Sequence, residues 1–475
     1  MRDLLVVRGG QVVLPQAVVD ADVWIAGETI AAVLAPGVEA PFGARVIDAA
    51  GCLVFPGLVD PHTHIQLDTG IYRTADDWEI GTRSAAFGGV TTVVDFATQF
   101  PGMTFEQALG ARLEECAPAL IDYGLHMMVT DLPADPAEAR RWLEVLRDSG
   151  VPSIKLYTTY RPNYYADDAT LLHTFRAMPP DMLAMIHCEN DALVSDATAR
   201  LVEAGRTGWA FHGQARPPEA EVEAIRRVLY LAQVAGAAVY IVHCSTGESV
   251  RVLEAARRDG ATRVFCETCP QYVWLDDSRY AAANAEHFVL QPPLRPTAWQ
   301  VDLLEAAPAL SAVSTDHCDY TLAQKQEFTT FTQTPGGLPG LETSFALTYT
   351  LGVRRAQERQ QAGEPVRPLS LPELARLMAG DPARLFGLWP KKGAILPGSD
   401  ADLMIYDPAP QVTIRAADQH TIAGYTPFEG ITVQGRARTV ISRGEVIVDD
   451  GALHASPGRG RFLRGAPFAL PPARP

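Results

Sequence analysis

The sequence predicts an α/β protein, in which a (β/α)8 TIM-like barrel is joined to a small β-sandwich domain formed by the N- and C-terminal segments. Three observations predict this fold. The chain has 475 residues, which allows one large domain and a smaller one. Eight short apolar runs alternate with helical stretches, and eight is the strand number of such a barrel. Short strands of alternating polarity stand at both ends of the chain.

The eight apolar runs are short and rich in β-branched residues, as buried parallel strands are. They lie at residues 52–60, 90–96, 124–130, 152–157, 182–188, 238–244, 263–267 and 311–316. The segments between them carry helix signals. Asp135 and Pro136, for example, match an N-cap and a first helical residue, and Gly150 matches the stop. Strand and helix therefore alternate as in parallel βαβ units.

The flanks of the chain have a different pattern, with short alternating strands punctuated by Gly and Asp-Pro. We expect residues 1–52 and 393–455 to form one small β-sandwich domain from both ends of the chain. Residues 53–392 would then form the barrel domain. The last segment, 456–475, is rich in Pro, Gly and Arg and predicts an extended tail that packs on a surface, such as that of a neighbouring subunit.

Composition excludes several classes of protein. A formal net charge of -16 argues against nucleic acid as a partner. No run of about 18 apolar residues is present to span a membrane, and the N-terminus reads as a strand instead of a signal peptide. Seven scattered cysteines, an odd number, predict no disulfide framework and fit a reducing cytoplasm. Cys266 and Cys269 lack the second pair that a zinc site would want, so we interpret them as structural.

Candidate metal ligands lie where the predicted strands end. His62 and His64 are two residues apart, so strand geometry directs both side chains the same way. His187, His243 and Asp316 close three other strands. Because the carboxyl ends of barrel strands meet at one rim, these five groups should converge, and imidazoles with a carboxylate suit a zinc-like cation. The alternative is that His187 and His243 are core histidines with satisfied hydrogen bonds.

Lys155 is the sixth candidate, because it lies inside an apolar strand. Of 40 basic residues only four are lysines, namely Lys155, Lys325, Lys391 and Lys392. A lysine in a chain that otherwise uses arginine suggests chemistry that a guanidinium cannot supply. Burial of an amine also costs solvation free energy, which a functional role would explain. A desolvated lysine can accept carbon dioxide, and the resulting carbamate would bridge two dications. The alternatives are a lysine that extends to the rim or pairs with an acid.

With these residues in place, the chain resembles the amidohydrolase superfamily and, more narrowly, the dihydropyrimidinase and hydantoinase family. The resemblance covers nearly the whole chain. The motifs that carry it are PGLVDPHTH, TADDWEIGTRSAAFGGVTTVVDF, SIKLYTTY, IHCEN, IVHCST, ETCPQY, PPLR, STDHC, PGLE, DPARLFGL, KKGAILPGSDADLMIYD and GRGRF. Several of these motifs are long and specific.

The resemblance implies two divalent metal ions, Zn2+ first, with Mn2+ or Co2+ as alternatives. One ion would be held by His62, His64 and Asp316, the other by His187 and His243, with carbamylated Lys155 bridging both. The resemblance also implies that Tyr160 contacts the scissile carbonyl and that Asp316 acts as general base and then general acid. The reaction would open the ring amide of a dihydropyrimidine or a 5-substituted hydantoin, which gives an N-carbamoyl amino acid.

The chain departs from the family pattern around the substrate. Gln291 stands in LQPPLR where relatives read CSPPLR, and Gly336 stands in PGG where relatives read PNG. In the family these two positions hold the ring amide through backbone groups, so Gln291 and Gly336 join Tyr160 as expected substrate contacts. The loop 65–74, IQLDTGIYRT, replaces an apolar segment that borders the ring substituent in relatives. We therefore expect a substituent unlike that of simple dihydropyrimidines.

Other activities stay open at this point. An allantoinase or another hydrolase of cyclic imides or ureides would share the metal set. Dihydroorotase is disfavoured, because Ile65 and Gln66 stand where it carries a carboxylate-binding arginine. A non-catalytic scaffold like the collapsin response mediator proteins is disfavoured by the complete ligand set. The resemblance further implies a homotetramer that acts on a small cyclic amide in the cytoplasm.

Overall fold

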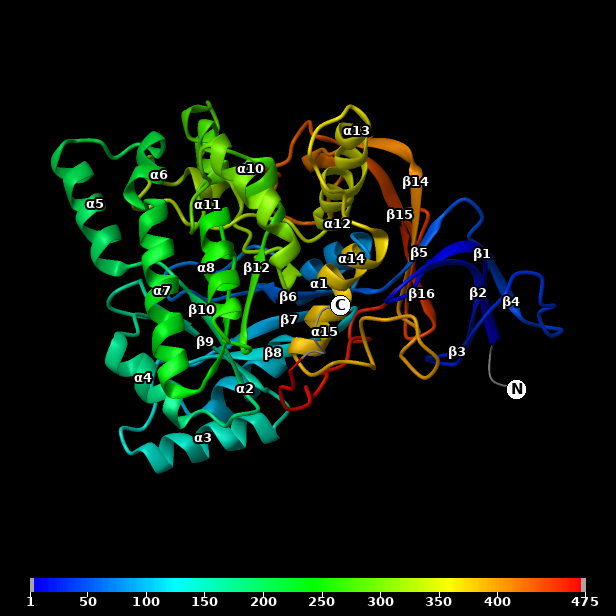
Figure 1. Ribbon diagram of the computed structural model, residues 1–475, viewed down its shortest axis with the longest axis horizontal. Helices are drawn as coiled ribbons and strands as arrows, with labels where there is room; N and C mark the ends of the chain where they lie inside the picture. The colour runs from blue at the N-terminus through cyan, green and yellow to red at the C-terminus, as the bar shows by residue number, and fades with distance from the viewer. Residues whose placement is uncertain (1–3, 471–475) are drawn as a thin grey trace.

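The computed structural model describes residues 4–470, which form a barrel and a separate sheet beside it (Figure 1). The ends of the predicted small domain and tail, residues 1–3 and 471–475, lie outside the described residues. The largest apolar cluster spans the barrel and part of the separate sheet, and a smaller one lies mainly within the separate sheet. The predicted fold class is confirmed.

The barrel sheet has eight parallel strands in chain order. They are β6 (Leu58–Thr63), β7 (Val90–Thr98), β8 (Asp122–Met128), β9 (Ser153–Tyr157), β10 (Leu183–His187), β11 (Ala238–Ile241), β12 (Val264–Thr268) and β13 (Ala312–Val313). A parallel bridge between Thr63 and His317 joins the first strand to the segment after the last. Every residue of β6, β8, β10, β11 and β12 is buried, which explains why they read as continuous apolar runs.

Helices connect the strands and cover the barrel. They are α1 (Trp78–Phe87), α2 (Phe105–Glu115), α3 (Pro136–Asp148), α4 (Asp168–Ala177), α5 (Asp191–Glu203), α6 (His212–Ala215), α7 (Pro218–Ala235), α8 (Gly247–Arg258), α9 (Pro270–Trp274), α10 (Thr297–Ala306), α11 (Leu322–Gln326), α12 (Ser344–Tyr349), α13 (Ala356–Gln361), α14 (Leu371–Ala375) and α15 (Asp381–Leu385). Asp135 caps α3 as predicted, because its side chain accepts from the Glu138 amide at 2.8 Å.

The first predicted strand is in fact two strands that belong to different sheets. β5 (Leu53–Pro56) pairs in the separate sheet and β6 starts the barrel, with Gly57 between them. A Cβ at Gly57 would overlap the Thr91 side chain, and the Gly57 amide donates to the Asp402 carbonyl at 2.8 Å. Glycine therefore lets the chain cross between the sheets where their backbones approach closely.

The separate sheet has nine strands from both ends of the chain, seen side by side at the right of Figure 1. They are β1 (Leu4–Val13), β2 (Val18–Ala26), β3 (Thr29–Leu34), β4 (Arg45–Asp48), β5, β14 (Leu403–Thr413), β15 (Thr432–Ser442), β16 (Glu445–Asp449) and β17 (Ala452–Leu453). The N- and C-terminal parts meet where β5 pairs antiparallel with β14.

The described part of the C-terminal tail packs on this chain's own barrel. It runs past the N-terminal ends of β8, β9 and β10, where Leu463 donates to the Tyr123 carbonyl, Gly465 to Gly150 and Phe468 to Asp181. The Leu463 and Phe468 side chains are buried there. This end of a barrel is the one that serves stability, so the tail closes the face opposite the strand tips.

Lys392 joins the tail-bearing side of the barrel to the separate sheet. Its ammonium contacts three carboxylates, those of Asp122 at 2.7 Å, Asp400 at 2.9 Å and Asp402 at 2.7 Å. Burial alone would lower the pKa of Lys392, but these carboxylates raise it above its ordinary value. The lysine therefore stays charged and neutralises a buried acidic cluster.

We expect Lys392→Met to lower the free energy of unfolding by about 3–5 kcal/mol, because buried Asp402 loses its ion-pair partner and Asp122 keeps only its pair with Arg443. Denaturant titration of both proteins measures this. Lys391→Met is the matched control. The Lys391 side chain is 60% exposed, and its ion pair with Asp400 is long at 3.9 Å. Equal stability of the two variants would contradict the role given to Lys392.

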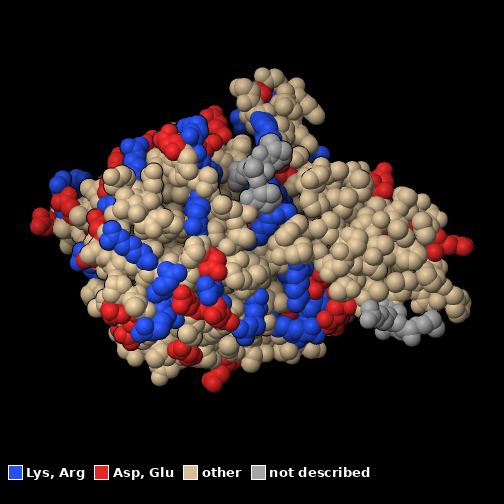
Figure 2. Space-filling view, turned by 60° about the horizontal axis from the view of Figure 1, so that its bottom comes forward, with Lys and Arg blue, Asp and Glu red and all other residues tan. Residues whose placement is uncertain are grey.

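The surface shows no gathering of one charge sign on the face in Figure 2, where acidic and basic side chains are interspersed over the barrel. Within residues 4–470 no helix combines the length and apolar character needed to cross a membrane.

Candidate active site

The six predicted metal ligands lie at the C-terminal ends of the barrel strands. His62, Lys155 and His187 belong to β6, β9 and β10, and His64 follows β6 directly. His243 follows β11 and Asp316 follows β13 after short extensions. This rim is where barrels of this kind position their functional side chains.

One half of the site consists of His62, His64 and Asp316. The Asp316 Oδ1 atom lies 3.3 Å from Nε2 of His62 and 3.4 Å from Nε2 of His64. The candidate ligand atoms of these three residues all lie within 4.8 Å of one another. Two imidazole nitrogens and a carboxylate so arranged match a divalent cation such as zinc.

The other half adjoins the first through Lys155 and His243. The Lys155 Nζ atom lies 3.3 Å from Nε2 of His62. The ring centroids of His187 and His243 are 4.6 Å apart, and those of His62 and His243 are 5.6 Å apart. The structure thus brings all six predicted residues together in one cluster.

Burial keeps three of these imidazoles neutral. It lowers the pKa of His62 and His243 well below the usual range and also lowers that of His187. Neighbouring positive charge lowers two of these pKa values further, mainly from Lys155 for His62 and from His187 and then Lys155 for His243. A neutral imidazole keeps the lone pair that a metal needs.

Lys155 differs from Lys392, the buried lysine that is paired with carboxylates. Its side chain is 1% exposed, and burial lowers its pKa to about 8, although Asp316 and Glu267 oppose the shift. Lys392 is equally buried but contacts three carboxylates, which raise its pKa. Lys155 therefore has a large neutral fraction near pH 8, the form that reacts with carbon dioxide.

Two carboxylates outside the cluster orient its histidines, and the sequence reasoning missed both. Glu267 lies 2.5 Å from Nδ1 of His62 and accepts from the Tyr240 hydroxyl at 2.7 Å. Glu189 lies 2.7 Å from Nε2 of His187 and pairs with Arg216. An imidazole that donates one N–H to a carboxylate presents its other nitrogen as a ligand. Each glutamate stands at the end of a predicted strand or directly after it, but this position alone does not mark it as a partner of a histidine.

Tyr160 lies beside the second half of the cluster. Its ring centroid is 5.0 Å from that of His187, and the Arg216 guanidinium lies 5.3 Å from its ring centroid. Burial raises the pKa of Tyr160, so the hydroxyl stays protonated and can donate. Tyr160, His243 and Asp316 all have positive φ, at 75°, 39° and 50°. Such strain in non-glycine residues is typical of functional sites.

The two expected substrate-binding segments also lie together. The Gly337 amide donates to the Val289 carbonyl at 3.0 Å, and a Cβ built on Gly336 would overlap the Gln291 carboxamide. The Gly336 carbonyl lies 4.0 Å from Sγ of Cys318, two residues after Asp316. The structure therefore places Gln291 and Gly336 against each other on the Asp316 side of the rim.

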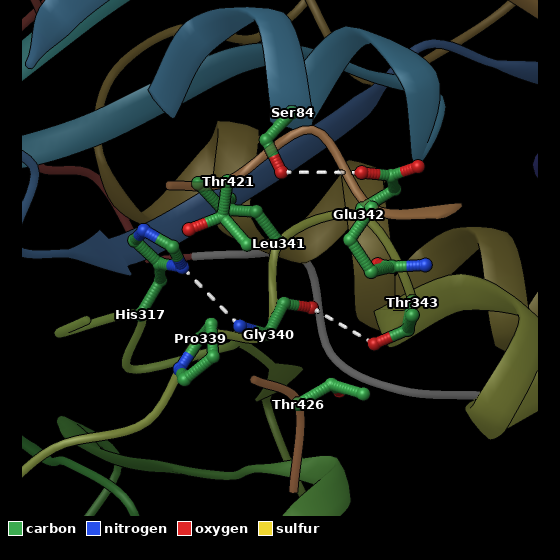
Figure 3. Close-up of a pocket in the computed structure, with 10 residues that line it drawn as sticks. Ser84, His317, Pro339, Gly340, Leu341, Glu342, Thr343, Thr421 and Thr426 are labelled. Carbon is green, nitrogen blue, oxygen red and sulfur yellow. Dashed lines mark hydrogen bonds between the residues drawn. The ribbon is translucent and has the colours of Figure 1, made fainter. Parts of the chain in front are cut away.

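A second acidic cluster lies behind Asp316, made by Asp76, His317 and Asp319. His317 Nε2 is 3.4 Å from Asp319 and 3.7 Å from Asp76. On its other side, Nδ1 accepts from the Gly340 amide at 3.2 Å, beside a cavity of about 10 Å³ (Figure 3). Because Nδ1 is the acceptor, the ring proton lies on Nε2, which faces the two carboxylates at ion-pair distance and is therefore not free to ligate a metal. The cluster anchors the backbone beside Asp316.

The donor set of the main cluster fits a pair of divalent cations. It offers four imidazoles, the Asp316 carboxylate and the Lys155 amine. The Asp316 side chain is 14% exposed, so the cluster opens to solvent on that side. Such a site can activate water and stabilise charge on a carbonyl oxygen.

Comparisons with known proteins agree with this chemistry. A model of the amidohydrolase family matches residues 53–447. A D-phenylhydantoinase of Escherichia coli O81 (strain ED1a) is 40% identical over 433 residues, which are 90% of each chain. The crystal structure of dihydropyrimidinase from Brevibacillus agri NCHU1002 superposes with a TM-score of 0.92 at 34% identity, covering 98% of this chain and 100% of that one. A D-hydantoinase (dihydropyrimidinase) from Thermus sp. gives 0.90 at 31% identity, with 98% and 99% covered.

Proposed function

Since this chain belongs to the amidohydrolase family, we propose that it is a binuclear metal-dependent hydrolase of cyclic amides. It opens the ring amide of a 5-substituted hydantoin or a dihydropyrimidine and releases an N-carbamoyl amino acid. The observation that carries this proposal is the convergence of six side chains from separate strand ends on one cluster. The names of the similar proteins, D-phenylhydantoinase and dihydropyrimidinase, support the substrate class.

The chain's own residues divide the metal-binding work. His62, His64 and Asp316 would hold one cation, and His187 and His243 the other. The neutral amine of Lys155 would add to carbon dioxide and lose a proton, and the resulting carbamate would supply anionic oxygen ligands to the cations. The cations, Zn2+ first with Mn2+ or Co2+ as alternatives, would lower the pKa of a water molecule and polarise the ring carbonyl.

Asp316 moves the proton in this reaction. Its carboxylate accepts the proton of the attacking water and returns it to the ring nitrogen that leaves, a general base that becomes a general acid. Its position supports this role, because it is the least buried of the six and touches the imidazoles of His62 and His64. The Tyr160 hydroxyl donates to the carbonyl oxygen as negative charge develops there.

Tyr160→Phe removes this donor and keeps the ring. We expect kcat to fall by about 10²–10³ with little change in metal content, as for loss of one oxyanion-hole donor. Steady-state kinetics on the best substrate measures the effect. Tyr165→Phe, five residues further along the same loop, is the matched control and should keep kcat. An unchanged kcat in Tyr160→Phe would show that the Tyr160 hydroxyl does not stabilise charge on the carbonyl oxygen.

The loop 65–74 supports a substituent unlike that of dihydrouracil. Ile71 is 79% exposed at its tip, and the Thr69 carbonyl accepts from Tyr164 at 3.4 Å. Tyr164 packs against Tyr157, whose ring centroid lies 5.7 Å from that of Tyr160. We therefore expect an apolar or aromatic group at ring position 5. If dihydrouracil were turned over as well as every other ring tested, this assignment would be wrong.

A substrate panel tests the proposed function as a whole. It contains 5-substituted hydantoins, dihydropyrimidines, allantoin and cyclic imides, each assayed before and after chelation and again after zinc is restored. We expect ring opening that a chelator abolishes and zinc recovers. Activity confined to allantoin would favour the allantoinase alternative, and activity that resists complete metal removal would contradict the proposal.

The homotetramer, the cytoplasmic location and the division into 1–52 with 393–455, 53–392 and 456–475 are part of the same proposal. The family resemblance supports the tetramer, and the cysteine pattern supports the location. The strand positions in the two sheets support the division. Light scattering of the purified protein tests the tetramer, with a monomer as the contradicting result.

A further inference from the structure

The Gln291 carboxamide occupies the space over Gly336. An ideal Cβ on Gly336 would overlap the side-chain oxygen, nitrogen and carbon of this carboxamide. Any side chain at 336 would therefore displace Gln291. A glycine at 336 and a long amide at 291 fit each other sterically, which makes their joint departure from the family pattern a single structural change.

The two segments that carry this pair are fixed to each other. Lys325 is fully buried, and its ammonium donates to the Val289 and Pro335 carbonyls, each at 2.8 Å. Each carbonyl belongs to a residue one or two positions before Gln291 or Gly336. Lys325 therefore ties the segment that carries Gln291 to the one that carries Gly336.

The carboxamide itself is unused by the protein. Gln291 is partly buried, yet its side chain forms no hydrogen bond with any other residue in 4–470. By contrast, the neighbouring carbonyls of Leu290 and Pro292 are taken by His212 at 2.8 Å and Tyr272 at 2.9 Å. A carboxamide that is positioned, half-buried and unpaired at the rim is available to a ligand.

We propose that Gln291 is a substrate-contacting specificity residue, whose carboxamide pairs with the C=O and N–H edge of the ring away from the scissile bond, in the space that Gly336 leaves. A carboxamide offers a donor and an acceptor side by side, which complements the acceptor and donor of a cyclic amide edge. This inference rests on the proposed function. It adds a side-chain contact to the backbone contacts expected at these positions.

The kinetic test compares a hydantoin with its analogue methylated at the ring nitrogen outside the scissile bond. For the unchanged enzyme we expect kcat/KM to be about tenfold lower on the analogue, as for one lost hydrogen-bond pair. Gln291→Met, which keeps length without polar atoms, should bring this ratio close to one and leave metal content unchanged. Gln333→Met, an exposed site, is the control that should keep the ratio. If Gln291→Met also kept the ratio while ring opening continued, Gln291 would not contact the substrate.

A thermal double-mutant cycle tests the pairing without any activity readout. Gly336→Ala is expected to lower Tm by a few degrees in the unchanged chain, because its methyl group displaces Gln291. The same change in a Gln291→Ser chain should have little effect, because the space is then free. Equal losses of Tm in both backgrounds would overturn the matched pair. If the enzyme opened no ring of the panel, the proposed function would fail, whereas this cycle would still decide the steric pairing.

Discussion

Lys155→Arg is expected to lose its bound metal and to lower kcat/KM by about 10⁴ or more. Guanidinium is protonated at every accessible pH, so it cannot add to carbon dioxide. Two dications carry four positive charges, and without a carbamate the Asp316 carboxylate is the anion left among the six ligand residues. The new cation would also stand among His62, His187 and His243, where the Lys155 charge already lowers their pKa values.

Elemental analysis of the purified variant, together with kcat/KM on the best substrate, measures this effect. ¹³C NMR of protein equilibrated with labelled bicarbonate adds a direct readout, since a carbamate signal should be present in the unchanged chain and absent in the variant. Lys391→Arg is the matched control, because that lysine is 60% exposed. Full metal content and activity in Lys155→Arg would show that metal binding and catalysis do not require a carbamate at this position.

Asp316→Asn is expected to lower kcat by about 10³, within the range for loss of a positioned general base. Asparagine keeps the shape and one ligand oxygen but cannot accept the proton of the attacking water. It also tolerates the positive φ of 50° at this position, so the backbone should not change. The remaining five ligand residues should still bind metal at saturating concentration.

The kcat and KM values of Asp316→Asn at saturating zinc separate a catalytic role from a structural one. We expect the loss in kcat, with KM within a few-fold of the unchanged enzyme. Asp302→Asn, in a surface ion pair with Arg251, serves as the control. A kcat within tenfold of the unchanged enzyme would show that another group moves the proton.

The sequence was sufficient to predict the barrel and its rim, because both depend on local periodicity. Buried parallel strands have nearly continuous apolar sequences. A ligand residue at the C-terminal end of such a strand lies at the rim of the barrel, whatever the path of the helix that follows. His62, His64 and His187 were found in this way. The division of the first predicted strand into β5 and β6 at Gly57 was not predicted. It depends on Thr91 and Asp402, which lie close to Gly57 only in the folded chain.

Contacts between distant segments were beyond the sequence. Glu267 orients His62 across 205 positions, and no local pattern distinguishes it from an ordinary strand-end acid. The scarcity of lysine singled out Lys155, yet Lys325 and Lys392 are also buried and serve structure, one through carbonyls and the other through carboxylates. Scarcity therefore did not separate Lys155 from the other lysines, and only the partners of each buried lysine distinguish their roles.

The proposed site depends on a carbamylated Lys155 that would bridge two cations held by histidines from separate strands. Anomalous diffraction at the zinc edge, from crystals grown with zinc and bicarbonate, tests this arrangement most directly. We expect two peaks, one among His62, His64 and Asp316 and one at His187 and His243, with density for a carboxylate on the Lys155 amine between them. A single peak, or an unmodified Lys155 amine beside two peaks, would contradict it.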